Sequence, residues 1–194
     1  MRIGLYFGSF NPIHIGHLIV ANHILNETEL QQIWFVVSPQ NPFKPSVTLL
    51  NEYDRLHLVR SAVKNDGRFK VSDIEFSLPK PSYTSHTLTY LKEKYPAHEF
   101  SIVMGSDSFQ NLGKWKNAHA IISDYPIYVY RRPGFEISNE IMAKLIVVNA
   151  PLLEISATYI RECLQQGKSI KYLVPDAVAE EIERSSFYKK THKK

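Results

Sequence analysis

The sequence predicts an α/β domain with a doubly wound parallel sheet. Short apolar runs rich in Val, Ile, Phe and Tyr alternate along the chain with longer amphipathic stretches. Such alternation favours parallel strands that are joined through right-handed helical crossovers. The chain has 194 residues, of which 44% are hydrophobic and 22% are charged. This composition is typical of a globular chain that is long enough to bury a sizeable core.

The expected strands are apolar runs that end at Gly, Ser or Pro. The first ends at Gly8-Ser9, the second at Ser38-Pro39, and the third before Pro79. β-Branched and aromatic residues dominate these runs, as is usual in strands. We expect strands at Ile3–Phe7, Ile33–Val37, Phe69–Phe76, Phe100–Met104, Ile127–Tyr130 and Leu145–Val148.

The expected helices carry apolar residues three and four positions apart. Pro96 and Gly167 end two of them, and Pro175 fits the first turn of the last. We expect helices at Ile15–Leu25, Leu50–Val63, Ser85–Tyr95, Ser156–Gln166 and Pro175–Arg184. Since the chain has no repeat or linker, we expect one domain over 1–194, with a helical C-terminal piece from about residue 155.

Charge and cysteine content narrow the class of protein. The basic tail 189–194 holds four of the 23 Lys and Arg residues, so the rest of the chain carries 19 basic and 19 acidic residues. A neutral body with a basic tail argues against nucleic acid as the main ligand. The lone Cys163 makes no intrachain disulfide and indicates a reducing compartment. We expect no signal peptide, no membrane span and a cytoplasmic location.

The segment His14-x-Gly16-His17 is the strongest functional motif. It follows a predicted buried strand and opens a predicted helix, so it lies where the ligands of such sheets bind. A helix N-terminus attracts phosphate through open N–H groups and its dipole, and two imidazoles can donate further hydrogen bonds. Gly16 would leave room for a ligand to approach the backbone. The alternatives are two ordinary histidines at a helix start, or a zinc site for which the sequence places no third ligand.

Two common phosphate-binding motifs are excluded, one because it is missing and one because it follows the wrong kind of element. No G-x-G-x-x-G follows the first strand, and Gly167-Lys168-Ser169 follows a helix instead of a strand.

A second anion-binding site is predicted further along the chain, at Ser156-Ala157-Thr158-Tyr159-Ile160-Arg161. There Ser156 can cap the helix, while Thr158 and Arg161 share a helix face. On its own this pattern also fits a capped surface helix.

Together the two motifs resemble the nucleotidyltransferase superfamily that uses an H-x-G-H loop and a late I-S-x-T-x-x-R helix. More narrowly, the chain resembles the bacterial nicotinate mononucleotide adenylyltransferases over nearly its whole length. The resemblance runs in order through Gly8–His17, Asn41–Lys44, Pro81–Thr84, Met104–Asp107, Lys114-Trp115, Arg132–Gly134, Ile155–Arg161 and Tyr172–Pro175. It implies a Rossmann-like nucleotide-binding fold. It also implies transfer of AMP from ATP to nicotinate mononucleotide with Mg²⁺, which releases pyrophosphate during NAD biosynthesis.

The resemblance assigns roles residue by residue. The catalytic residues would be His14, His17, Lys44 and Arg161, and none of them is expected to bind a metal. The acceptor would contact Lys44, Tyr83 and Thr84, with Trp115 stacked on the pyridine ring. ATP would contact Gly8, Ser9, Phe10, His14, Gly16, His17, Gly105, Asp107, Ile155, Ser156, Thr158 and Arg161. The expected partners are therefore these two nucleotides, with a homo-oligomer left open.

Three positions depart from the family pattern. Asn11 stands where Asp is common in the first loop, which weakens a role for this position in binding magnesium. Phe43 stands where His is usual before the lysine. His86 stands where Asp often precedes Thr-Leu, and it bears on the acceptor contacts.

Other interpretations of the supporting residues stay open. Trp115 could be a core or interface residue, Asp107 a helix cap, and Lys44 a solvated side chain of a Pro-rich loop. Tyr125, Tyr128 and Tyr130 are interpreted as strand packing. At the level of function, the alternatives are another H-x-G-H enzyme, such as a phosphopantetheine adenylyltransferase or a cytidylyltransferase, and a nucleotide-binding module without turnover.

Overall fold

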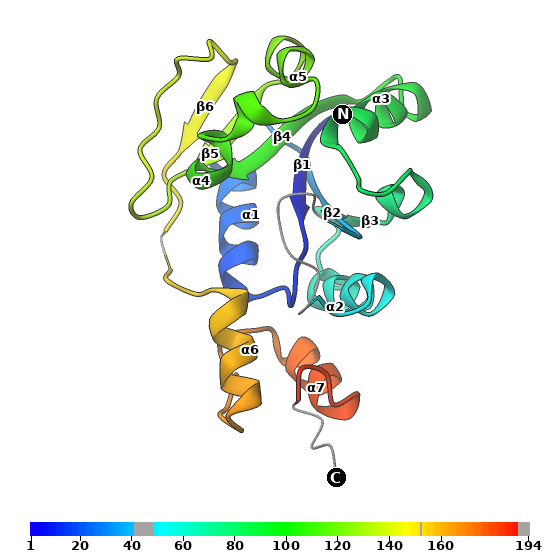
Figure 1. The fold of residues 1–194 in the computed structure, drawn as a ribbon, viewed down its shortest axis with the longest axis vertical. Helices are drawn as coiled ribbons and strands as arrows, with labels where there is room; N and C mark the ends of the chain where they lie inside the picture. The colour runs from blue at the N-terminus through cyan, green and yellow to red at the C-terminus, as the bar shows by residue number, and fades with distance from the viewer. Residues whose placement is uncertain (41–48, 152, 190–194) are drawn as a thin grey trace.

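The computed structural model of the chain describes residues 1–40, 49–151 and 153–189. Its centre is a six-stranded parallel sheet in the order β3-β2-β1-β4-β5-β6 (Figure 1). The strands are β1 (Arg2–Gly8), β2 (Gln32–Val37), β3 (Phe69–Ser72), β4 (Glu99–Gly105), β5 (Ile127–Tyr130) and β6 (Leu145–Val148). The order reverses between β1 and β4, which confirms the predicted doubly wound sheet.

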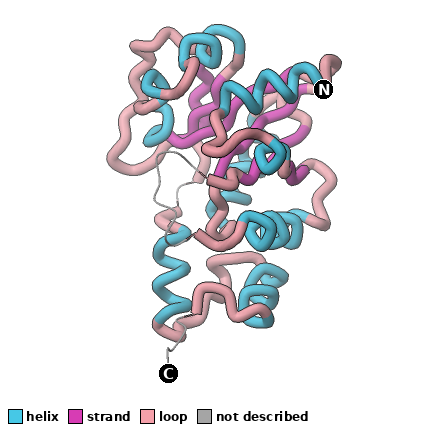
Figure 2. The backbone as a smooth tube through the Cα atoms, turned by 45° about the vertical axis from the view of Figure 1, so that its right-hand side comes forward, coloured by secondary structure: helices cyan, strands magenta, loops and turns pink. Residues whose placement is uncertain are grey.

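The helices lie on both faces of this sheet, as Figure 2 shows. The longer ones are α1 (Ile15–Glu27), α2 (Glu52–Val63), α3 (Thr84–Lys94), α6 (Ala157–Gln165) and α7 (Asp176–Arg184). Shorter ones are α4 (Ser106–Phe109), α5 (Ala118–Asp124) and the 3₁₀ turns η1 (Ile74–Ser77) and η2 (Leu112–Lys114). The helices α6 and α7 lie at the end of the molecule away from α3 and α5 (Figure 1), which confirms the predicted helical C-terminal piece.

Alternate residues of the central strands point to opposite faces and build two apolar layers. On β2, Phe35 packs with residues of α1 and α2, whereas Trp34 and Val36 pack with residues of α3 and α5. Parallel strands are buried on both faces and therefore consist of almost continuous apolar residues. This explains why runs such as Ile33–Val37 stand out in the sequence.

The third strand is shorter than predicted. We expect a strand over Phe69–Phe76, but β3 ends at Ser72 and the chain continues in η1. The hydroxyl of Ser72 accepts a hydrogen bond from the Ile74 amide at 3.3 Å. A serine side chain that bonds to a nearby backbone amide competes with the strand ladder, and here it ends the strand.

The segment between β4 and β5 holds three short elements that the sequence pattern does not predict. These are α4, η2 and α5. The N-cap of α5 is Asn117, whose φ of 55° lies in the left-handed region. Asparagine tolerates this conformation better than most residues do, and so permits the sharp turn before α5. Among the helices of the described residues, none is long and apolar enough to cross a membrane.

Candidate active site

A cavity of about 550 Å³ opens at the carboxyl ends of β1 and β4. This is the point where the strand order reverses, and open α/β sheets bind their ligands there. Most of the predicted site residues line it: Gly8, Ser9, Phe10, His14, His17, Tyr83, Thr84, Gly105, Asp107, Trp115, Ile155, Ser156, Thr158 and Arg161. The structure therefore brings together residues that lie up to about 150 positions apart in the sequence.

The two histidines of the H-x-G-H motif are stacked at the start of α1. Their ring centroids lie 3.7 Å apart and their planes are tilted by 31°. The backbone amide of His14 donates a hydrogen bond to Nδ1 of His17 at 3.2 Å. Because Nδ1 accepts, the proton of a neutral His17 ring resides on Nε2. The structure thus gives His17 a donor on the opposite ring nitrogen.

His14 is held in its neutral form. Its side chain is only 7% exposed, and its Nδ1 is buried with no hydrogen-bond partner among the described residues. Burial, with a smaller effect from the nearby charge of Arg132, lowers the pKa of His14 to about 4. An unsatisfied polar atom costs free energy, and an anion or hydroxyl bound in the cavity could supply the missing partner.

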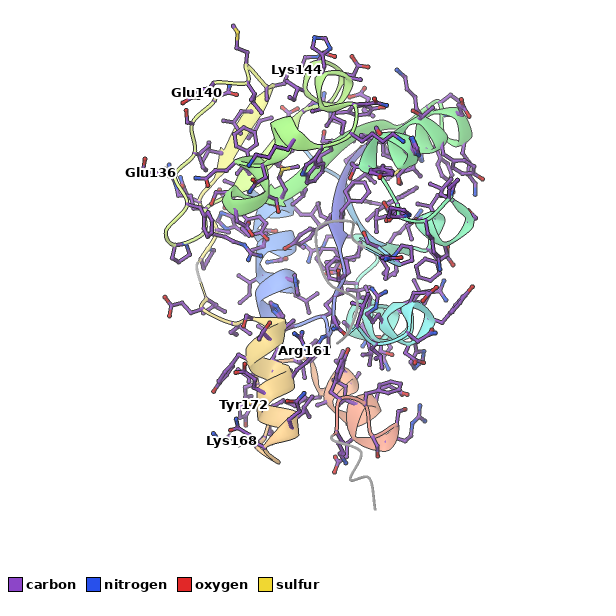
Figure 3. The ribbon with its side chains drawn as sticks, in the orientation of Figure 1. Glu136, Glu140, Lys144, Arg161, Lys168 and Tyr172 are labelled. Carbon is purple, nitrogen blue, oxygen red and sulfur yellow. The ribbon has the colours of Figure 1, made fainter. Side chains whose placement is uncertain are left out.

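The start of α6 contributes a second group of polar side chains. The Ser156 hydroxyl accepts a hydrogen bond from the Tyr159 amide at 3.1 Å, which confirms the predicted N-cap. Arg161 donates to the Thr158 hydroxyl at 3.2 Å and to the carbonyl of Asn11 at 2.8 Å. These two bonds hold the guanidinium on the inner side of α6 (Figure 3). Arg161 and the histidines thus approach the cavity from two elements.

Gly105 at the end of β4 gives room to an ion pair. A Cβ at this position would lie 2.5 Å from Oδ1 of Asp107 and 2.8 Å from Nε of Arg132. The Arg132 guanidinium lies 3.3 Å from that same Asp107 oxygen. The backbone amide of Arg132 donates to the buried Ser106 hydroxyl at 2.9 Å. A side chain at this position would therefore force Asp107 and Arg132 to move.

Sequence reasoning assigned no role to Tyr130 and Arg132, and the structure places both on the cavity wall. The Tyr6 hydroxyl donates to the Tyr130 hydroxyl at 3.0 Å, and Arg132 donates to the Tyr130 hydroxyl at 3.0 Å. Burial, followed by the neighbouring Tyr130, raises the pKa of Tyr6 well above its usual value. The available signal was the segment Arg132-Pro133-Gly134, whose arginine follows a strand as Asp107 does.

The predicted acceptor residues lie together on another part of the wall. Tyr83 is the N-cap of α3, Thr84 is its first residue, and Trp115 follows η2. The Lys116 ammonium lies 4.5 Å from the centroid of the Tyr83 ring, and it also lines the cavity. The His86 ring lies 5.7 Å from the Tyr83 ring. This wall thus combines aromatic faces with a positive charge and the N-terminus of a helix.

Glu75 is a third residue on the cavity wall that sequence reasoning missed. It belongs to η1, is 2% exposed and lines the cavity. Oε1 accepts a hydrogen bond from the Thr87 hydroxyl at 2.9 Å, which ties η1 to α3. Burial raises the pKa of Glu75, and hydrogen bonds from Ser82, Thr87 and Ser38 oppose this effect. No motif marked this position, because its role arises from contacts between separate elements.

Two glycines of the predicted ATP site act through packing. A Cβ at Gly8 would lie 2.7 Å from the Phe10 ring. That ring is 3% exposed and lies edge to face with His17 at 5.1 Å between centroids. A Cβ at Gly16 would lie 3.1 Å from Nδ1 of His14. Gly16 is not among the described residues that line the cavity, so the room it leaves is used by the His14 ring.

Arg55 braces the two loops that border the cavity. Its guanidinium is fully buried and donates to the carbonyl of Ser9 at 2.6 Å, after β1, and to that of Ser38 at 2.8 Å, after β2. Two further bonds reach the carbonyls of Leu50 and Pro39. Burial lowers the pKa of Arg55. The cavity mouth is therefore fixed by a side chain that lies inside the core.

Lys44, predicted as a catalytic residue and as an acceptor contact, lies outside the described residues, as does Phe43. In the part of the chain that the structure describes, no group of three or more His, Cys, Asp and Glu side chains is placed to hold a metal ion. Asp107, the carboxylate on the cavity wall beside Arg132, is engaged in the ion pair.

Comparisons with known proteins agree with this geometry. The family model described as cytidylyltransferase-like matches residues 5–163. A solved structure of nicotinic acid mononucleotide adenylyltransferase from Plasmodium falciparum, complexed with NaAD, superposes with a TM-score of 0.82. The match covers 96% of this chain and 97% of that chain at 23% sequence identity, and so supports the fold.

Relatives among curated proteins are much closer in sequence. A probable nicotinate-nucleotide adenylyltransferase of Cytophaga hutchinsonii is 51% identical over 97% of this chain and 98% of its own length. One of Flavobacterium psychrophilum, with the same name, is 50% identical over 98% of this chain and its full length. With half of its residues shared over nearly its whole length, this chain belongs to the cytidylyltransferase-like family and, within it, to the nicotinate-nucleotide adenylyltransferase family.

Proposed function

We propose that the protein transfers AMP from ATP to nicotinate mononucleotide and forms nicotinate adenine dinucleotide and pyrophosphate. The relatives that share half of its sequence carry the name of this activity. The observation that carries the proposal is the stacked pair His14 and His17 at the start of α1, which faces the same cavity as Arg161. Three nitrogen-bearing side chains thus line one cavity beside a helix N-terminus, and such a terminus favours phosphate.

The reaction needs no protein nucleophile. A phosphate oxygen of the mononucleotide attacks the α-phosphorus of ATP, a new P–O bond forms, and the bond to the bridging oxygen of pyrophosphate breaks. Positioning and charge stabilisation supply most of the catalysis in such transfers. We assign His17, His14 and Arg161 to the phosphates of ATP, with Ser156 and Thr158 at the same end.

The remaining site residues receive roles on the same basis. Asp107 and Gly105 would border the ribose of the adenosine, and Trp115 would stack on the pyridine ring. Tyr83 and Thr84 would contact the pyridine carboxylate at the start of α3, where open amides favour an anion. Lys44 is proposed for the phosphates where the two substrates meet. Gly8, Ser9, Phe10 and Ile155 would shape the wall around ATP, and Gly16 would act by leaving room for the His14 ring.

Magnesium belongs to this proposal as a companion of ATP. Mg²⁺ is commonly held by substrate phosphates with one or two protein oxygens. When bound to the triphosphate it neutralises charge on the departing pyrophosphate. The described side chains offer no cluster of metal ligands, so the triphosphate and water would supply most of its oxygen ligands. We further propose that the enzyme works in the cytoplasm, where both nucleotides are available.

The experiment that tests the proposal is product analysis with a panel of acceptors. Purified protein is incubated with ATP, Mg²⁺ and one acceptor in each reaction. The three acceptors are nicotinate mononucleotide, nicotinamide mononucleotide and 4′-phosphopantetheine. Pyrophosphate release and the adenylylated product are measured by chromatography. We expect nicotinate adenine dinucleotide and pyrophosphate in equal amounts. Transfer to phosphopantetheine alone, or no transfer to any acceptor, would refute the proposal.

A further inference from the structure

Three separate segments of the chain converge on Asn11, which lies in the loop between β1 and α1. Its side-chain oxygen Oδ1 accepts hydrogen bonds from the Leu50 amide at 3.2 Å and from the Tyr188 hydroxyl at 2.8 Å. Its backbone carbonyl accepts a hydrogen bond from Arg161 at 2.8 Å. Asn11 is 7% exposed and lines the cavity. One buried amide thus connects the loop after β1 to the start of α2, to α6 and to the turn that follows α7.

Tyr188 belongs to that turn and is itself firmly placed. Its backbone φ is 65°, in the left-handed region that bulky residues rarely adopt. The residue packs against the apolar layer that contains α1 and α2, and the amide of the preceding Phe187 donates to the carbonyl of Ile182 at 3.1 Å. Burial raises the pKa of Tyr188, so its hydroxyl keeps its proton and remains a donor to Asn11.

The hydrogen bonds continue from Tyr188 to the cavity in two steps. Tyr188 holds the side chain of Asn11, and the carbonyl of the same residue receives Arg161. Asn11 also lies three residues before His14 on the same loop. A shift of Asn11 would therefore move an acceptor of Arg161 together with the loop that leads to the histidines. Catalytic geometry tolerates little displacement of this kind, since small misplacements cost large factors in rate.

We propose that Tyr188 is a positioning residue of the ATP site, whose hydroxyl fixes Arg161 in the cavity through Asn11. Tyr188 does not line the cavity and so acts only through its neighbours. The proposal rests on the assignment of Arg161 to the phosphates of ATP made above. It gives the C-terminal piece a part in substrate binding beyond the residues of α6.

The test is Tyr188→Phe, which keeps the ring and removes the hydroxyl. The matched control is Tyr172→Phe, because Tyr172 is 78% exposed and lies on the outer side of the C-terminal piece (Figure 3). Loss of one buried hydrogen bond should raise the KM and the dissociation constant of ATP by about three- to tenfold. We expect kcat to fall as well, while the KM of the mononucleotide changes little and the melting temperature falls by only about 2–4 °C.

A double variant distinguishes positioning of Asn11 by Tyr188 from a general loss of stability. If Tyr188 acts through Asn11, the double variant Asn11→Ala/Tyr188→Phe should lose no more ATP affinity than Asn11→Ala alone. Losses that add, an unchanged ATP affinity in Tyr188→Phe, or equal increases in both KM values with a lower melting temperature would each overturn the inference. ATP binding measured by calorimetry keeps this test independent of turnover. Absence of adenylyl transfer by the wild-type enzyme would overturn the proposed function instead.

Discussion

The His14 amide donates to Nδ1 of His17, and the two rings lie stacked at 3.7 Å between centroids. The backbone of one histidine thus sets the tautomer and orientation of the other. Oriented donors of this kind act on charge that develops in the transition state, with no reorganisation during the reaction. The relationship makes His17 the more informative of the two residues to change.

Replacement of His17 by alanine should lower kcat by about 10²–10³, a far larger effect than its weakening of ATP binding. The reason is that, in the proposed assignment, its donor faces charge that grows as pyrophosphate departs. His23→Ala is the control, since His23 is on the same helix and is not among the residues that line the cavity. Steady-state kinetics and ATP titration measure both effects. Wild-type turnover in His17→Ala would remove the catalytic assignment.

The free energy of unfolding should decrease below neutral pH because of His14. The pKa of its imidazole is lowered from 6.5 to about 4, chiefly by burial and then by Arg132. Between these values the unfolded chain binds a proton that the folded chain does not, so stability rises with pH in this range. The loss between about pH 7.5 and about pH 5 that is due to His14 should be about 2 kcal/mol.

Urea unfolding of the wild type and of His14→Gln at the two pH values measures this contribution. The difference between the two pH values should be smaller in the variant by about the same amount, because glutamine does not titrate. An identical pH dependence in both proteins would show that folding does not perturb His14.

Arg161→Lys should raise the KM of ATP and lower kcat. A lysine ammonium is a point charge and cannot bond Asn11 and Thr158 while it also presents a forked face to phosphate. We expect at least about a tenfold loss of kcat/KM. Arg60→Lys is the control, since that side chain is 56% exposed and pairs with Asp73. Unchanged constants in Arg161→Lys would argue against the phosphate contact.

Trp115→Ala should weaken binding of the mononucleotide by about 1–3 kcal/mol, as loss of aromatic stacking does for nucleobases. ATP affinity should change little. Trp115→Phe provides the comparison, because it keeps an aromatic face. Trp115 also packs against the apolar layer that contains α3 and α5. Equal losses for both substrates together with a lower melting temperature would therefore indicate a role in folding.

Nicotinate mononucleotide should be preferred over nicotinamide mononucleotide by roughly 30- to 1,000-fold in kcat/KM. Nicotinate mononucleotide carries a carboxylate on the ring, and nicotinamide mononucleotide carries an amide in its place. The start of α3 at Thr84 and the ammonium of Lys116, 4.5 Å from the Tyr83 ring, both favour the anion.

The control for this preference is Lys116→Met, which should reduce the preference without lowering activity on the amide substrate. The measurement is kcat/KM for both mononucleotides at saturating ATP and Mg²⁺. Equal values in the wild type would contradict this interpretation of the acceptor wall and leave adenylyl transfer intact. A preference that persists in Lys116→Met would assign it to the start of α3 alone.

The fold could be predicted because its signals are local. Parallel strands are buried on both faces, so runs such as Ile33–Val37 are apolar throughout, and Gly, Ser and Pro mark where they end. The end of β3 could not be predicted, because it depends on one hydroxyl of Ser72 bonded to the backbone. The short helices before β5 were missed since elements of four to seven residues carry no periodic pattern.

The site likewise contains residues that could be predicted from the sequence and residues that could not. His14, His17 and Arg161 belong to motifs whose spacing is visible in the sequence, and they line one cavity. Tyr130 and Glu75 line the same cavity without any motif. Tyr6 and Tyr130 are bonded across a separation of 124 residues, and only the neighbouring positions of β1, β4 and β5 bring them together. Such contacts are a property of topology and cannot be seen in local spacing.

The buried guanidinium of Arg55 affects how the enzyme binds its substrates. It donates to the carbonyls that follow β1 and β2. The two loops at the rim of the cavity are therefore fixed when the core forms during folding. The entropy of ordering these loops is lost during folding, before either nucleotide arrives. The entrance is thus preorganised, and association does not need to select a minor conformation of these loops. The order of the cavity entrance and the stability of the fold therefore depend on the same side chain.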